Sequence, residues 1–328
     1  MISLFAFLAV VQSVNVKAAE GDVARIPPKA APGFGALGGL GLVPTSNPTI
    51  TYEGWIAPAK NPSDIEQERL LLQIPVYRGA INTLSVSLGG EALHFGDPPP
   101  LSTGVALPQN LWKFDLSTSF SHRIDEDKLI GGGLSFGSAS DHPFASGDVD
   151  TVGGSLFYSW PASETNRWVV SVFFSNNNPI LNYFPIPGFM YLTQGKTLIG
   201  MFGFPLNTVI WMPEAPWMFT LSIFGPTVHA EAAWGTPSRF QAFVGFHWLQ
   251  QSFLLEDRPH PNDRLYFAQK KIPVGVRFPL WNVLTSEFSA GYAFARILEQ
   301  GPHLGSDEDG RVSFGNTYYA AWNLRMIF

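Results

Sequence analysis

Apolar and polar residues alternate with a period of two along most of the chain. In residues 111–121, Phe114, Leu116 and Phe120 lie on one side of the extended chain, and Asp115 and three serines lie on the other. An amphipathic helix would repeat its apolar positions every three or four residues instead. A period of two is typical of β-strands that turn one face toward an apolar environment. The chain is therefore predicted to be all-β.

The same alternation recurs in segment after segment. It predicts strands at residues 49–56, 68–76, 84–88, 111–121, 128–136, 151–160, 167–174, 197–211, 217–224, 228–234, 239–248, 271–278, 285–297 and 318–328.

The links between these segments alternate in length. Short links at 123–127, 161–166, 214–216, 235–238 and 279–282 take turns with long ones at 137–150, 175–196, 250–262 and 300–312. Barrels of the bacterial outer membrane have short periplasmic turns and long outer loops. The sequence thus predicts a transmembrane up-and-down antiparallel β-barrel of about 14 strands, with a last strand that ends at Phe328. About 12 strands is the alternative, if Gly225 and Pro226 form a kink or bulge inside one long strand.

A soluble β-sandwich would also show alternation, because its sheets hide one face. The tryptophans favour the barrel, since membrane barrels carry aromatic girdles near their strand ends. On the apolar side, toward the ends of predicted strands, we find Trp160, Trp168, Trp211, Trp217, Trp234, Trp248, Trp281 and Trp322.

Composition agrees with an apolar surrounding. Charged residues make up 14% of the chain, against about 25% in ordinary soluble domains. Beyond the first twenty residues no apolar run is long enough for a membrane-spanning helix, so a chain that crosses a bilayer would do so with strands. The absence of cysteine excludes disulfides, thiolate chemistry and a lipoprotein anchor. The net charge of −6 gives no basic footprint for nucleic acid.

Residues 1–19 have features of a secretory signal peptide. An apolar block at residues 2–14 is followed by the small residues Ala18 and Ala19, although the usual preceding positive charge is missing. A short buried strand or helix is the alternative. Residues 20–48, rich in proline and glycine, are predicted to be a flexible leader, and residues 49–328 the barrel.

The final sixteen residues, SFGNTYYAAWNLRMIF, place bulky apolar side chains at every second position up to Phe328. This pattern resembles the carboxy-terminal signal of bacterial outer-membrane β-barrels. The resemblance implies that Trp322, Leu324, Met326 and Phe328 are presented to the barrel-assembly machinery. An amphipathic strand of a soluble sheet is the other reading.

Further short motifs resemble an uncharacterised family of porin-like bacterial outer-membrane β-barrel proteins, filed under a domain of unknown function. The likeness spans residues 97–328, and its motifs are PGFMY at 187–191 running into GKT at 195–197, GFP at 203–205, DRLYF at 263–267, GVR at 275–277, SAGYAF at 289–294 and the last strand. None of these motifs is tied to a reaction. The resemblance implies the fold and the bacterial outer membrane as location, with lipid and lipopolysaccharide as neighbours.

If the apolar faces look outward, the polar faces line the interior. The side chains predicted to line a pore are Asp115, Arg167, Arg239, Gln241, His247, Arg277, Glu287, Asn323 and Arg325. We expect a passive pore for small hydrophilic solutes, with no cofactor, no metal and no catalytic residue. A non-conducting structural or surface-interaction barrel is the alternative.

A third hypothesis is a lipid-modifying enzyme at the rim. His122 beside Ser119 and Ser121 is the nearest approach to a catalytic pair, but Ser121 and His122 lie on opposite faces of a strand. The acidic run at 306–310 suggests a calcium site, for which a solvated loop or divalent bridging to lipopolysaccharide are the competing readings. Residues 175–196 are apolar for a loop and are expected to fold into or over the mouth.

Overall fold

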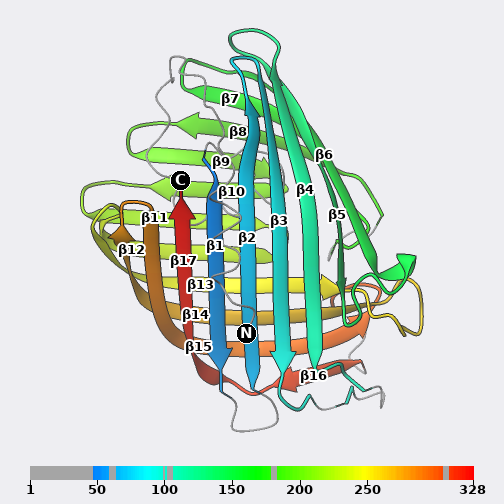
Figure 1. Ribbon diagram of the computed structural model, residues 1–328. Helices are drawn as coiled ribbons and strands as arrows, with labels where there is room; N and C mark the ends of the chain where they lie inside the picture. Colours follow the sequence, from blue (N-terminus) through cyan, green and yellow to red (C-terminus); the bar gives the residue numbers. More distant parts are fainter. Residues whose placement is uncertain (1–46, 59–63, 99, 102–105, 179–182, 306–309) are drawn as a thin grey trace.

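The computed structural model describes residues 47–58, 64–98, 100–101, 106–178, 183–305 and 310–328. Within them the chain forms one antiparallel sheet of 17 strands (Figure 1). The strands are β1 (Thr49–Ala57), β2 (Ile65–Arg78), β3 (Asn82–Phe95), β4 (Asn110–Arg123), β5 (Leu129–Ser140), β6 (Asp150–Pro161), β7 (Asn166–Ser175), β8 (Ile186–Gln194), β9 (Leu198–Phe204), β10 (Leu206–Trp211), β11 (Trp217–Phe224), β12 (Thr227–Thr236), β13 (Phe240–Phe253), β14 (Arg264–Trp281), β15 (Leu284–Gly301), β16 (Arg311–Phe314) and β17 (Thr317–Ile327). A short 3-10 helix, η2 (Gly147–Val149), precedes β6.

The sheet closes on itself because β1 pairs with both β2 and β17. The seam with β17 runs from Thr49 opposite Ile327 to Ile56 opposite Ala320. The first part of β15 pairs with β17 and a later part with β16, so β16 adds no position around the wall. The result is a closed antiparallel barrel of 16 strands.

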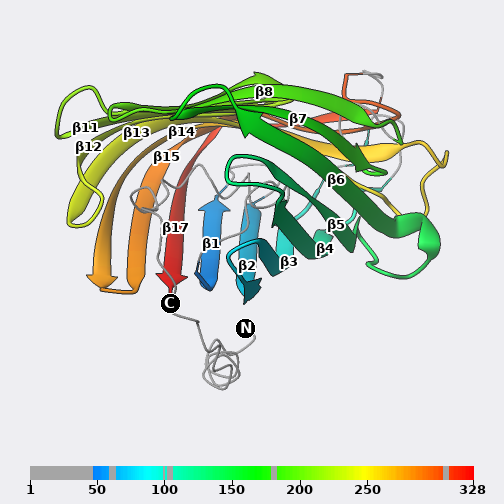
Figure 2. The ribbon, with the colours of Figure 1, turned by 90° about the horizontal axis from the view of Figure 1, so that it is seen from above.

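The two ends of the barrel differ. At the end we call the turn end, tight links join β2 to β3, β4 to β5 and the following pairs, and the amide of Phe328 donates to the carbonyl of Pro48 at 3.0 Å. The opposite end, the loop end, carries the long connections after β1, β3, β5, β7, β13 and β15. Figure 2 shows the wall of β1–β5 facing the strands β7, β8, β13 and β14 across the interior.

The predicted strand number was too low. Residues 186–194, expected within a long loop, form β8, and the single strand expected at 197–211 is the hairpin of β9 and β10, with Met201 opposite Thr208. Gly225 and Pro226 lie between β11 and β12, so the 12-strand alternative is wrong as well. The missed strands are apolar on both faces. Buried Ile186 and Met190 alternate in β8 with exposed Phe189, so no polar face marked a strand.

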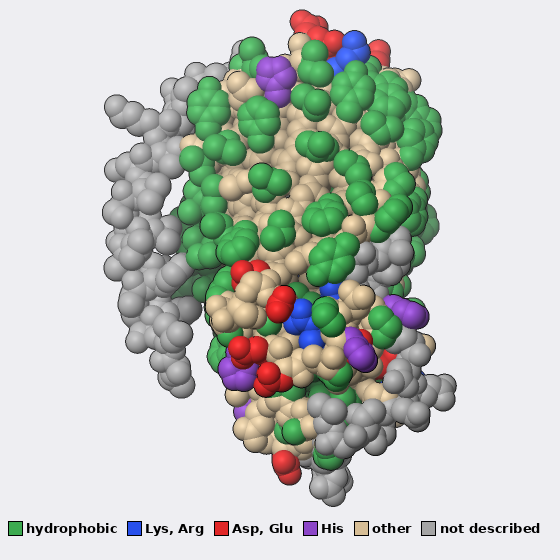
Figure 3. All heavy atoms as spheres, turned by 90° about the vertical axis from the view of Figure 1, so that its right-hand side faces the viewer, with side chains coloured by type: hydrophobic (Ala, Val, Ile, Leu, Met, Phe, Trp, Pro, Cys, Tyr) green, Lys and Arg blue, Asp and Glu red, His purple; other side chains and the backbone are tan. Residues whose placement is uncertain are grey.

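The outer surface is apolar between the two ends. Exposed outward side chains include Leu134, Leu156 and Val274, at 72%, 64% and 60% exposure. From the side that carries β4–β6, hydrophobic side chains form a band with charged groups gathered at both ends (Figure 3). Such a band is the outer surface expected of a barrel in lipid.

Aromatic side chains gather at the margins of this band. Trp168 lies against Tyr191 at the turn end, with ring centroids 4.7 Å apart, and Trp112 stacks on Phe114 toward the loop end. Trp322 departs from the expected girdle. It lies halfway along β17, opposite Gly54 of β1.

The predicted signal peptide at 1–19 and nearly all of the leader at 20–48 lie outside the described residues; only Asn47 and Pro48 of the leader are described, directly before β1. The described residues contain no helix that is long and apolar enough to cross a membrane.

The seam between β1 and β17 generates a test. A Cβ atom on Gly54 would lie 2.4 Å from Cε2 and Cζ2 of Trp322, so Gly54→Val forces the indole ring off the seam. We expect the unfolding free energy to fall by about 1–3 kcal/mol, as overpacking usually costs, and adding Trp322→Ala to restore most of it. The measurement is the temperature at which the folded band disappears on gels of unboiled samples.

Gly90→Val is the matched control, since a Cβ there meets Phe114 at an ordinary 3.8 Å. Equal melting of the Gly54→Val and Gly90→Val variants would contradict this account of the seam.

Candidate functional site in the barrel interior

The inner face of β2–β7 is made of small polar side chains. The pairing register brings Gln73, Ser87, Ser117 and Ser135 side by side on four neighbouring strands. The same row continues through Gly153 of β6 to Ser175 of β7, and we call it the serine row. These serines can be recognised in the sequence because they occupy the polar positions of each strand. Their alignment into one row depends on the pairing register between the strands, which cannot be read from the sequence.

The next row toward the loop end holds Asp115. It lies between Gly89 of β3 and Gly137 of β5, so neither neighbour has a side chain that covers the carboxylate. Lys113 follows two residues away on the same face of β4. In the part of the chain that is described, the side chains of Lys113 and Asp115 form no hydrogen bond and no salt bridge, and Lys113 and Arg69 act on the Asp115 carboxylate electrostatically from a greater distance.

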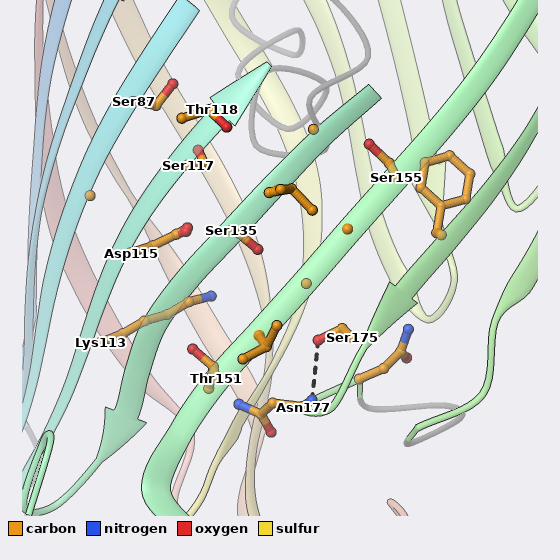
Figure 4. A pocket seen from close by; sticks show the side chains of 18 of the residues that line it. Ser87, Lys113, Asp115, Ser117, Thr118, Ser135, Thr151, Ser155, Ser175 and Asn177 are labelled. Carbon is orange, nitrogen blue, oxygen red and sulfur yellow. Dashed lines mark hydrogen bonds between the residues drawn. The ribbon is translucent and has the colours of Figure 1, made fainter. Parts of the chain in front are cut away.

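These two rows line a cavity of about 360 Å³. Figure 4 shows Lys113, Asp115 and Ser117 following one strand, with Ser135 on the neighbouring strand and Thr151 and Ser155 beyond it. Asn177, just after β7, closes one side, and its backbone amide donates to the hydroxyl of Ser175 at 3.1 Å. Phe173 and Phe224 add an apolar portion to the lining.

A second polar region, on β12–β15, consists of paired charges. Arg277 donates from Nε to Glu287 at 2.7 Å and from Nη2 to Glu231 at 3.1 Å, and its Nη1 lies 3.3 Å from Oε1 of Gln241. Asn323 of β17 donates to Glu53 of β1 at 3.2 Å. Because Arg277 is bonded to both carboxylates, this region acts as a fixed ion-pair network of the wall.

The sequence-predicted pore residues fall into three groups. The register turns most of them inward: Asp115, Gln241, His247, Arg277, Glu287, Asn323 and Arg325. Arg167 lies near the turn end, where it donates to the hydroxyl of Ser159 at 3.0 Å and to the carbonyl of Asp127. Arg239 is misplaced by the prediction. It lies exposed in the turn between β12 and β13, because β13 begins one residue later.

Inward residues that the sequence reasoning missed include His229, Glu231 and Lys113. His229 stacks on His247 with ring centroids 4.1 Å apart, and Glu231 pairs with Arg277. The alternation in residues 227–236 carried the signal, since His229 and Glu231 share one parity and Trp234 has the other.

Part of the inner face is apolar, which the sequence did not indicate. The inner positions of β6–β10 include the buried cluster Phe157, Val169, Phe173, Ile186, Met190, Met201 and Leu206. In β8–β10 the outer positions are apolar too, so the period-two pattern is lost there. The interior therefore has a polar side and an apolar side.

The loop end is crossed by contacts between opposite walls. Side chains from β1–β5 and β13–β17, including Phe95, Phe267 and Phe314, pack into one buried cluster. Glu91 of β3 accepts hydrogen bonds from Gln67 of β2 and from Gln251 of β13 across the interior.

Two loops add further contacts across the opening at the loop end. After β7, Asn177 donates from Nδ2 to the carbonyl of Ser252 at 3.0 Å, so the first residues of the expected mouth loop do cross the opening, whereas residues 186–194 belong to the wall. The loop after β13 reaches β5, where the amide of Leu254 donates to Ala139 at 2.7 Å. Residues 179–182 lie outside the described part.

The rim-enzyme hypothesis gains no support from position. His122 is hydrogen-bonded to Asn82 at 2.7 Å near the turn end, and it shares the outer face with Phe120. Ser119 and Ser121 lie on the inner face of the same strand, with a strand backbone between them and the imidazole.

Within the described residues, no group of three or more His, Asp and Glu side chains is placed to hold a metal ion. Residues 306–309 of the acidic run considered for calcium lie outside that part of the chain.

No family model matches the chain, and no curated protein matches it either. Several solved structures are similar in fold. They include the KdgM porin (8% identity, TM-score 0.30, covering 85% of this chain and 99% of that chain), the CymD monoaromatic hydrocarbon channel (9%, 0.40, 86% and 88%) and the Pseudomonas putida toluene transporter TodX (8%, 0.37, 88% and 91%).

The ion-pair network predicts a large loss of stability when its cation is removed. Arg277→Met leaves Glu231 and Glu287 buried without a counter-charge, which typically costs about 3–5 kcal/mol. Adding Glu231→Gln and Glu287→Gln should recover most of the loss. The measurement is urea unfolding of the protein folded in lipid vesicles.

Arg239→Met serves as the control, because that side chain is exposed in a turn and should change stability by less than about 0.5 kcal/mol. An Arg277→Met variant as stable as this control would show that the network contributes nothing.

Proposed function

We propose that the chain is a bacterial outer-membrane β-barrel that acts as a passive pore for small hydrophilic solutes. The observation that carries the proposal is a closed 16-stranded wall with an apolar outer band and a polar cavity inside. Bacterial barrels of about 16 to 18 strands enclose an aqueous channel, whereas about 8 strands leave an interior filled by side chains. A barrel of 16 strands therefore favours an open pore more strongly than a barrel of the predicted 14 strands would.

The mechanism is diffusion past fixed polar groups, with no chemical step. The serine row offers hydroxyls that exchange hydrogen bonds with a hydrated solute. Of the interior charges, Arg277 is paired with two carboxylates, Glu231 and Glu287, so that cluster keeps one negative charge, while Lys113 and Asp115 line the cavity without a salt bridge. A pore lined by charges of both signs has only weak selectivity for ions.

Location and partners follow from the same proposal. Residues 1–19 would direct the chain through the inner membrane. Trp322, Leu324 and Met326 on the outer face of β17, with Phe328 directly after it, would be read by the barrel-assembly machinery. Outer-membrane lipid and lipopolysaccharide would then surround the apolar band.

A second candidate is a non-conducting barrel with a structural or surface role. The specific observation in its favour is the packing of β1–β5 against β13–β17 at the loop end, with loops bonded across the opening.

Planar-bilayer recording of the refolded protein separates the two candidates. We expect discrete conductance steps in potassium chloride that are absent when the protein is denatured before addition. A protein that inserts, as shown by protease protection, and never conducts would favour the non-conducting barrel.

The loop after β13 predicts a gating variant. Arg258 holds this loop in place with three hydrogen bonds. It donates to the carbonyls of Leu255 at 2.8 Å, Pro261 at 3.1 Å and Asp148 at 2.9 Å. Arg258→Ala removes all three bonds, so we expect the channel to be open several times longer, or about tenfold if the bonds together stabilise closure by about 1.4 kcal/mol.

Arg123→Ala, at the turn end, is the matched control for the loss of one arginine. Identical open times in the Arg258→Ala and Arg123→Ala variants would rule out a role of this loop in gating.

A further inference from the structure

The cavity beside Asp115 has the chemistry of a solute site. Its polar side presents hydroxyls at regular spacing, because the serine row crosses neighbouring strands that lie about 4.8 Å apart. Each hydroxyl can donate one hydrogen bond and accept two. A row of such groups matches a solute that carries several hydroxyls of its own at comparable spacing.

Asp115 adds a strong acceptor one row away from the hydroxyls. Gly89 beside it leaves the carboxylate accessible, since a Cβ on Gly89 would lie 3.8 Å from the Cβ of Asp115 and any longer side chain would extend over it. Hydrogen bonds from a neutral donor to a carboxylate are stronger than bonds between neutral groups. A solute hydroxyl that reaches Asp115 would therefore be held more firmly than one that meets serine alone.

The charges that line the cavity balance. Arg69 and Lys113 supply two positive groups, and Glu91 and Asp115 supply two negative ones. These four lining charges sum to zero, so the lining gives no net preference for an anion or a cation.

An apolar side completes the site. Phe173 of β7 and Phe224 of β11 line the same cavity and belong to the apolar side of the interior. Sugar rings combine apolar C–H faces with hydroxyl edges, so they fit a space with a hydroxylated wall on one side and phenylalanine on the other. The volume of about 360 Å³ falls at the lower end of the range for small-ligand pockets, about 300–1,000 Å³.

We propose that this cavity is a binding site for uncharged, polyhydroxylated solutes of monosaccharide to disaccharide size on their way through the barrel. The proposal rests on the pore function above and names the solute class that the pore prefers. Asp115 and Ser117 bind the hydroxyl edge of the solute, and Phe173 contacts its apolar face.

The test is swelling of proteoliposomes that contain the full-length protein. The probes are glucose, the zwitterion glutamine, the anion gluconate and the cation glucosamine. We expect glucose to enter faster than each of the others by about fivefold, the effect of roughly one net hydrogen bond. Equal entry of glucose and glutamine while the protein still conducts ions overturns the solute class and leaves the pore function standing.

Substitutions then place the preference at this cavity. Ser117→Ala with Ser135→Ala should reduce the glucose preference to within about twofold of glutamine, because two hydroxyls of the row are lost. Ser119→Ala is the matched control, since it lies on the same face of β4 but outside the cavity lining. A control that loses the preference as fully as the double variant would overturn the assignment.

Charge variants give a readout that simple misfolding would not produce. Asp115→Asn leaves Lys113 uncompensated and should speed gluconate entry relative to glucosamine, whereas Lys113→Met should do the opposite. The same ion preference in both variants would remove these residues from the solute path and overturn the proposal. Absence of any conductance or swelling in the wild-type protein would overturn the pore function and this inference together.

Discussion

Closure of the sheet is the constraint on which the rest of this structure depends. In a hydrocarbon environment every unpaired backbone amide or carbonyl costs several kcal/mol, by general estimates, so a spanning sheet cannot keep a free edge. The chain meets this constraint at the seam, where β1 pairs with β17 over most of its length. Once that seam forms, one face of every strand must look outward and the other inward, and the separation into an apolar band and a polar interior follows.

Closure also fixes how much room lies inside. Sixteen strands enclose more space than side chains of ordinary size fill, yet here opposite walls meet at the loop end through Phe95, Phe267 and their neighbours. The space that remains is bounded by the small residues of β2–β7, because serine and glycine leave a gap where larger side chains pack elsewhere. The polar cavity is thus a consequence of residue size as much as of polarity.

The sequence predicted the antiparallel barrel and most of its strands, because outward Leu116 and Phe120 alternate with inward Asp115 and Ser117. The prediction failed in strands whose inner and outer faces are both apolar. β8 is apolar on both faces and follows a proline-rich stretch, so it was assigned to a loop. The resemblance to a porin-like family was drawn partly from the motif at 187–191, which lies in this missed strand.

The candidate site was less predictable than the fold. Face parity indicated that Arg277 and Glu287 point inward, but only the register shows that they bond each other. The register also shows that Asp115 lies between two glycines of the neighbouring strands. The predicted position of Arg239 was wrong because strand ends cannot be located to better than a residue or two. Here one residue separates a position in the wall from an exposed turn. Contacts across the interior, such as Gln251 with Glu91, join residues far apart in sequence and leave no local pattern.

The most direct test of this account compares two adjacent positions on β4. Because the chain has no cysteine, single cysteines at Leu116 and Ser117 can be labelled one at a time in proteoliposomes with a charged, water-soluble thiol reagent. The account predicts that Ser117→Cys reacts and that Leu116→Cys is protected until the lipid is replaced by denaturant. Rapid labelling of Leu116→Cys in intact vesicles, with Ser117→Cys protected, would show that the polar and apolar faces have been assigned the wrong way round.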